Sequence, residues 1–234
     1  MGPRRSRPHP RKRATGGHSR YGLSRAASVR PTLPVVVVVC DDCKTAVAYF
    51  TQLRRKVKSD VTLHVVKAPC HGATPDDVVT LAIQEAKQYR GRASHDREDH
   101  RESVWALIDL EGDAARQRQT HDAKKKGEEK NIQVALSNPC FEVWTLAHLV
   151  GTGESFKDCS EVLGRVKKEW KKRFKMPFGS KKAQADYAKL MPLCAKALES
   201  TKKRKPRNDH SWTDVWRVVE DIDQKICQYT SHSG

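Results

Sequence analysis

Residues 104–113 constrain the fold of this chain more than any other stretch, because a short apolar run in them ends in acidic residues. Five consecutive apolar residues, 104–108, are followed at every second position by Asp109, Glu111 and Asp113. Five residues are too few for an isolated helix, whereas a strand that is apolar on both faces belongs inside a parallel sheet covered by helices. We therefore expect a buried strand whose last residues carry carboxylates.

The acidic end of this expected strand is a candidate metal site. Open α/β sheets bind ligands at the carboxyl ends of their strands. Residues two apart on a strand, or in the turn after it, point to the same side, so Asp109 and Glu111 could direct two oxygen ligands at one divalent cation. The alternative is a solvated acidic loop with no site. This stretch alone leaves both interpretations open.

A second expected strand also ends in acids. Five valines in a row, residues 35–39, are followed by Cys40, Asp41 and Asp42. Apolar spacing and helix-start residues predict further strands at 61–66 and 132–136 and helices at 44–58, 74–89 and 114–126. This order predicts an α/β fold with a mostly parallel sheet flanked by helices.

Residues 137–142 are expected to form a strand-to-helix turn, with Asn138 as the N-cap and Pro139 in the first helical position. In a parallel sheet this helix would begin beside the acidic strand ends and bring Glu142 there. The alternative role of Glu142 is a favourable interaction with the helix N-terminus. From residue 160 onward the chain is expected to be helical and basic, and residues 211–214 form a candidate capping box for the last helix.

Charge divides the chain into parts. The formal net charge is +17, to which residues 1–30 contribute +9 through nine Lys/Arg and no acid, and the remainder +8. We expect a disordered basic arm at 1–31, an α/β core at 32–150 and a helical C-terminal part at 151–234 packed on that core. Such charge favours a polyanion such as nucleic acid, or an anionic membrane, although the arm could also serve solubility alone.

Cysteine usage and hydropathy give three further expectations. No apolar run approaches the ~20 residues that span a bilayer, and residues 1–30 lack the apolar segment of a secretory signal, so a cytoplasmic location is expected. Seven cysteines are an odd number, which favours free thiols over disulfides. Cys40 and Cys43 form a single CxxC that Cys70-His71 could complete, but this is a weak zinc pattern, and we expect no zinc.

Three segments together resemble the RloB-like family. They are Val39-Cys40-Asp41-Asp42-Cys43-Lys44-Thr45 with Tyr49-Phe50, then residues 104–111, and finally Ala135-Leu136-Ser137-Asn138-Pro139-Cys140-Phe141-Glu142-Val143-Trp144 through to His148. The resemblance covers residues 35 to about 225, and the Ser-Asn-Pro-Cys-Phe-Glu-x-Trp segment is its most specific motif. It implies a Toprim-like fold and a bacterial protein of restriction-associated phage defence.

The resemblance also implies a Mg²⁺-dependent nuclease site. In Toprim nucleases a Glu after the first strand and an Asp-x-Asp after the third bind Mg²⁺ and cut phosphodiester bonds. These positions correspond to Asp41, Asp109 and Glu111. Asp41 and Glu111 depart from the family's residues but keep a carboxylate of altered length, and the family's Gly and Glu that follow the first acid are replaced by Asp42 and Cys43.

These residues carry the roles that we expect in such a site. Asp109 and Glu111 would hold Mg²⁺ or Mn²⁺, Asp41 would be a further ligand or a proton acceptor, and Glu142 would be an additional carboxylate beside the metal. Two functions remain open. The first is a metal-dependent nuclease, acting on DNA or RNA with an ATPase partner as the resemblance implies. The second is a catalytically impaired Toprim-like module that binds nucleic acid or the ATPase without cutting.

Overall fold

Two central strands, β1 (Val35–Cys40) and β3 (Glu102–Asp109), form the middle of the sheet, as their apolar sequences predict. The structure is a computed structural model, and it describes residues 33–41, 44–69, 73–90, 102–111, 114–151, 153–179, 185–203 and 210–233. The other strands are β2 (Thr62–Lys67), β4 (Gln133–Asn138) and β5 (Trp212–Thr213). The helices are α1 (Thr45–Val57), α2 (Pro75–Arg90), α3 (Ala114–Glu128), α4 (Glu142–Leu149), α5 (Cys159–Phe174), the 3₁₀ helix η1 (Tyr187–Leu193), α6 (Cys194–Lys202) and α7 (Val215–Ser233).

The strands are arranged in the order β2-β1-β3-β4-β5, and the first four are parallel. Among the described strands, only β5 is antiparallel, and it pairs with the end of β4. In this arrangement the chain leaves β1 toward β2 on one side and later returns to place β3 on the other side. The carboxyl ends of β1 and β3 therefore border the crevice where doubly wound sheets bind ligands.

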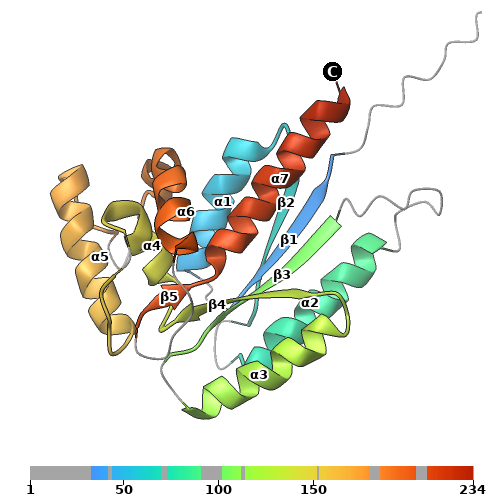
Figure 1. Ribbon diagram of the computed structural model, residues 1–234, viewed down its shortest axis with the longest axis horizontal. Helices are drawn as coiled ribbons and strands as arrows, with labels where there is room; N and C mark the ends of the chain where they lie inside the picture. Colours follow the sequence, from blue (N-terminus) through green and yellow to red (C-terminus); the bar gives the residue numbers. More distant parts are fainter. Residues whose placement is uncertain are drawn as a thin grey trace, which may run out of the picture. The chain divides into compact units, whose positions relative to one another are not determined.

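Helices cover both faces of the sheet (Figure 1), and alternate residues of β1 enter two different cores. Val36 and Val38 pack with α1, α4 and the C-terminal helices, whereas Val37 and Val39 pack with α2 and α3. Because side chains alternate across a strand, a run of valines supplies both layers at once. The α/β class, the mostly parallel sheet flanked by helices and the helical C-terminal part are confirmed.

The last strand corrects the expected start of the final helix. Trp212 and Thr213 pair with β4, so residues 211–214 are not a capping box, and α7 begins at Val215. Ser211 instead accepts a hydrogen bond from the Phe156 backbone N–H at 3.0 Å. The two paired residues are too short a strand to show a period-2 pattern, and their partner lies far away in the sequence.

The expected cap of α4 was also wrong. Asn138 is the last residue of β4, its side chain donates to the His210 carbonyl at 3.1 Å, and the helix begins four residues later at Glu142. By contrast, the helix expected at 74–89 is capped at its first residue: the Asp77 N–H donates to the Thr74 hydroxyl at 3.2 Å, and the Thr74 N–H donates to the Asp77 carboxylate at 2.8 Å. Within the described residues, no helix combines the length and apolar character needed to cross a membrane.

Candidate acidic site at the carboxyl ends of the strands

Asp41 and Asp109 follow from the two central strands and lie side by side. The Asp41 N–H donates to the Leu107 carbonyl at 3.1 Å, which continues the β1–β3 ladder by one residue. The Asp109 N–H lies 3.5 Å from the Asp41 carboxylate, at the limit of a hydrogen bond. The two acids thus meet at the crevice between β1 and β3, as the parallel sheet predicted.

Glu111 lies just beyond the strand, in a turn that is tied to the neighbouring chain segment. The Leu110 N–H donates to the Ser137 carbonyl at 2.9 Å, and the Glu111 N–H donates to the Pro139 carbonyl at 2.8 Å. Glu111 has φ 54°, in the left-handed region, so strand alternation ends at Asp109. Its side chain is 56% exposed, against 12% for Asp41, so Glu111 faces solvent at the rim of the site.

Glu142 reaches the same edge from the first turn of α4. Its carboxylate accepts a hydrogen bond from the Thr45 hydroxyl at 2.8 Å, and Thr45 is the first residue of α1. Asp109 lies close enough for the two negative charges to repel one another. The sequence motif that contains Glu142 is therefore brought to the acidic strand ends, although its helix starts later than expected.

Arg116, on the first turn of α3, supplies a positive charge that sequence reasoning missed. Its guanidinium forms a hydrogen-bonded ion pair with the Asp41 carboxylate, and its Nε donates to the Asp109 backbone carbonyl at 2.7 Å. The same Nε is 3.8 Å from Glu111. Nothing in the sequence distinguishes this arginine from Arg118 two residues later; only the docking of α3 selects it.

The acids do not share this positive charge equally. Burial, the negative charge of Glu142 and that of Asp41 raise the pKa of the Asp109 carboxyl well above its usual value, and a hydrogen bond from the Phe141 N–H only partly opposes them. Burial also raises the pKa of Asp41, against the opposing effect of Arg116. Among the described residues, no Lys, Arg or His side chain pairs with Asp109 or Glu142. The two carboxylates thus lie together at this edge without a cation among the described residues to offset their mutual repulsion.

Two thiols flank this centre. Cys140 is buried, and its thiol interacts with the thiol of Cys159, the first residue of α5; this interaction lowers the pKa of the Cys159 thiol. The contact fixes the start of α5 beside the start of α4. Helices α1, α3, α4 and α5 therefore all begin at this edge of the sheet, and the partial positive charge at a helix N-terminus favours anions.

Part of the residue pattern in 140–148 serves the core instead of the site. His148 is fully buried, its Nδ1 donates to the Trp144 carbonyl at 2.8 Å, and its Nε2 lies 3.3 Å from the Tyr49 hydroxyl. Burial lowers the pKa of His148 to about 4, so the ring is neutral. Of the weak zinc pattern, only Cys40 lies within the described residues, and it is buried at the end of β1.

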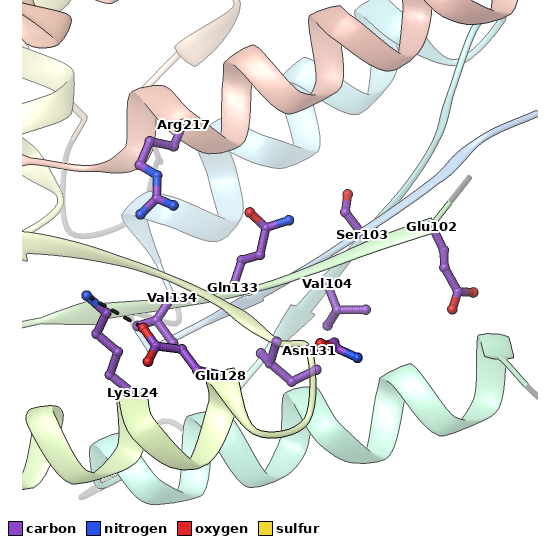
Figure 2. A pocket seen from close by; sticks show the side chains of 10 residues that line it. Glu102, Ser103, Val104, Lys124, Glu128, Asn131, Gln133, Val134 and Arg217 are labelled. Carbon is purple, nitrogen blue, oxygen red and sulfur yellow. Dashed lines mark ion pairs between the residues drawn. The ribbon is translucent and has the colours of Figure 1, made fainter. Parts of the chain in front are cut away.

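A separate hollow of about 770 Å³ lies at the opposite end of the sheet, where β3 and β4 begin (Figure 2). β4 first pairs with β3 at Trp105. Before this residue, the edge of β3 on the β4 side has no strand beside it among the described segments. On α3, the Lys124 Nζ and the Glu128 Oε1 are 3.9 Å apart. These two side chains face Arg217 of α7 across the hollow. None of the acids of the candidate site lines it.

Comparison with known proteins gives one match. Neither the curated proteins nor the solved structures include a protein that matches this chain. A family model described as "RloB-like protein" matches residues 36–222, a range that extends from β1 to α7 and includes all four candidate acids. The chain therefore belongs to the RloB-like family.

Proposed function

We propose that this protein is a metal-dependent nuclease that hydrolyses phosphodiester bonds. Its active site would consist of Asp41, Asp109, Glu111 and Glu142. The observation that carries the proposal is the pair Asp109 and Glu142, two carboxylates that repel one another at the ligand-binding edge of the sheet with no paired cation among the described residues. The RloB-like resemblance supports placing this activity in bacterial phage defence, in the cytoplasm and with an ATPase partner.

The donor atoms fit a hard divalent cation. Mg²⁺ is usually held by one or two carboxylates together with substrate phosphates, so Asp109 with Glu142 or Asp41 would be enough. Within the described part of the chain, no three His, Cys, Asp or Glu side chains lie together as a metal-binding group. When bound, the ion would polarise the phosphoryl group that is attacked.

The protein's own groups supply the remaining functions. Asp41 would serve as a further ligand or as the proton acceptor, whereas Asp109, whose pKa is raised by burial and neighbouring charge, would lose its proton when a metal ion binds. The Thr45 hydroxyl fixes the orientation of Glu142. Arg116 can turn from Asp41 toward a phosphate oxygen, for which a planar guanidinium is well suited.

The decisive test is cleavage of labelled duplex DNA and tRNA by the full chain with Mg²⁺ or Mn²⁺, with and without chelator. Asp109→Asn keeps the size of the side chain but removes its charge, and we expect it to lower the cleavage rate at least ~100-fold. Asp122→Asn is the matched control, since Asp122 is an exposed acid of α3, and it should cleave normally. Unchanged cleavage by the Asp109 variant would overturn the site.

A second candidate is a binding module that does not cut, and one observation favours it. Asp41, the acid that corresponds to the family's first catalytic position, is already neutralised by Arg116. A protein of this kind would bind nucleic acid or a partner protein but would not hydrolyse nucleic acid with any metal ion. Nucleic-acid binding without cleavage by wild-type protein, together with no binding of Mn²⁺, would establish this alternative.

A further inference from the structure

Helix α5 has two chemically opposite faces. One face is buried through Val162, Val166 and Trp170. Six exposed cations follow in the second half of the helix and just after it, namely Lys167, Lys168, Lys171, Lys172, Arg173 and Lys175. Most of the positive charge of this helix is therefore concentrated in a short length of its exposed side, which we call the α5 basic face.

The charges of the α5 basic face are not neutralised within the described structure. The two acids of the helix are used elsewhere: Glu161 accepts a hydrogen bond from the Lys157 N–H at 2.8 Å, and the buried Glu169 pairs with Arg165 at 2.8 Å. None of the six cations has an ion-pair partner among the residues that the structure describes. Like charges at i,i+4, such as Lys168 and Lys172, repel one another, so this surface reduces helix stability unless an anion covers it.

The position of α5 connects this surface to the acidic site. The helix starts at Cys159, whose thiol interacts with that of Cys140, two residues before Glu142. At 1.5 Å per residue, Lys167 lies about 12 Å and Lys175 about 24 Å along the helix direction from that start. Each strand of a duplex carries a phosphate every ~3.4 Å of the duplex axis, so the stretch between these lysines is long enough to contact more than one phosphate.

The chemistry of the face indicates which kind of anion it fits. Proteins that hold single strands stack the bases on exposed aromatic rings, but Trp170 is fully buried and Phe174 packs edge-on against it at 4.7 Å. A membrane surface would call for apolar side chains among the cations, and Met176 is the one large apolar side chain exposed in the described stretch 159–179. Flexible lysines with neither feature suit the phosphates of a duplex backbone.

We propose that the α5 basic face binds the phosphate backbone of a nucleic-acid duplex and leads one strand toward the acidic site. This inference rests on the proposed function for its substrate class, but it does not require that cleavage takes place. The surface contacts phosphates only, so the binding should depend weakly on base sequence and strongly on salt.

The test compares two full-length variants with equal changes of charge. The first replaces Lys167, Lys168, Lys171 and Lys172 by Gln. The control replaces Arg54, Arg55, Lys56 and Lys58 by Gln, four exposed cations at or next to the end of α1 away from the acids. Binding to a 20-base-pair duplex, to a single strand and to phosphatidylserine vesicles is measured in chelator over a range of salt, and circular dichroism verifies that both variants are folded.

For the duplex, we expect the α5 variant to reduce the magnitude of the slope of log affinity against log salt by about 2–4, whereas the control variant changes this magnitude by less than about 1. Equal slopes for the two variants would overturn the inference, as would loss of vesicle binding with unchanged duplex binding. Because chelator prevents metal-dependent cleavage, a selective loss of duplex binding supports the inference even if the wild-type protein never cuts. If the wild-type protein cuts but the α5 variant binds the duplex as wild-type does, the α5 assignment is rejected while the proposed function stands.

Discussion

At the scale of single residues, the placement of charge around Asp41 decides how the acidic site can be used. Arg116 bonds to Asp41, whereas Asp109 and Glu142 have no cation paired with them among the described residues. A metal ion at Asp41 would have to compete with a guanidinium that is already there. This competition can be measured directly.

We expect Arg116→Gln to tighten Mn²⁺ binding by about tenfold, because a hydrogen bond to a charged group is worth ~1.5–3 kcal/mol and ~1.4 kcal/mol corresponds to tenfold. Titration calorimetry measures the affinity. Arg118→Gln is the matched control, since it removes the same charge from an exposed position on the same helix. A lower Mn²⁺ affinity in the Arg116 variant would show that the arginine organises the site instead of competing for it.

His148 makes stability dependent on pH. Burial lowers its folded pKa from 6.5 to about 4, so the unfolded chain binds the proton more tightly. The contribution of the neutral ring to stability is therefore complete above pH 6.5 and is lost as the pH falls through about 4. At ~1.4 kcal/mol per pKa unit, the loss is on the order of 3 kcal/mol.

Two measurements check the behaviour of His148. Urea unfolding between pH 7 and 4 gives the free energy of unfolding, and ¹⁵N NMR identifies the neutral ring with its proton on Nδ1, the nitrogen that donates to Trp144. A His148 ring that titrates near pH 6.5 in the folded protein would contradict the buried arrangement.

At the scale of secondary-structure elements, the shortest strand, β5, positions the longest helix, α7. β5 contains only Trp212 and Thr213, yet it pairs with β4 and leads directly into α7. Further along, Asp221 of α7 accepts hydrogen bonds from Ser103 and from the Trp105 indole at 2.9 Å, both on β3. The C-terminal helix is thus held by polar contacts at two points on the sheet, in addition to its apolar face.

Thr213→Val tests the attachment of β5. The buried hydroxyls of Ser137 and Thr213 are 2.9 Å apart, and the Thr213 hydroxyl also accepts the Val215 N–H at 3.2 Å, so the variant removes a partner from both groups. We expect the free energy of unfolding to fall by about 1–3 kcal/mol, measured in urea. Thr230→Val, at an exposed position of α7, should cost little. In the double variant with Ser137→Ala the loss should be smaller than the sum of the single losses; strict additivity would show that the two hydroxyls do not interact.

At the scale of the whole molecule, positive charge is distributed between the N-terminal arm and the folded part, which carry +9 and +8 respectively. Acidic side chains meet at one edge of the sheet, while exposed cations gather on α5, whose start lies at that edge. A polyanion attracted by the total charge could thus be bound close to the carboxylates. The expected arm at 1–31 lies outside the described residues, so its role is accessible only by experiment.

Removing residues 1–30 should weaken duplex binding and lower its salt dependence, because each phosphate that the protein no longer neutralises reduces the log–log slope by ~0.9. Fluorescence anisotropy over a range of salt measures both quantities. A full-length variant with the nine Lys/Arg of the arm replaced by Gln separates the effect of charge from that of chain length. An unchanged slope in the shortened protein would mean that the arm does not bind phosphates.

The sequence by itself determined the central part of the fold. Apolar runs that end in acids predicted β1 and β3, because a strand buried on both faces needs an uninterrupted apolar sequence. The same pattern placed Asp41 and Asp109 at one edge, since parallel strands end together. The Glu142 motif was correctly expected near that edge, although the start of its helix was wrong by several residues because Asn138 extends β4 instead of capping α4.

Only the tertiary structure decided what depends on contacts between distant segments. β5 follows from pairing across more than seventy residues, and a two-residue strand has no pattern of its own. The docking of α3 brings Arg116, and not Arg118, to the acidic site. The exposure of Glu111 follows from a turn in which its N–H donates to the Pro139 carbonyl. Local sequence records which residues prefer strand or helix, but the electrostatics of the site arise from side chains that meet only after the sheet and its helices have packed.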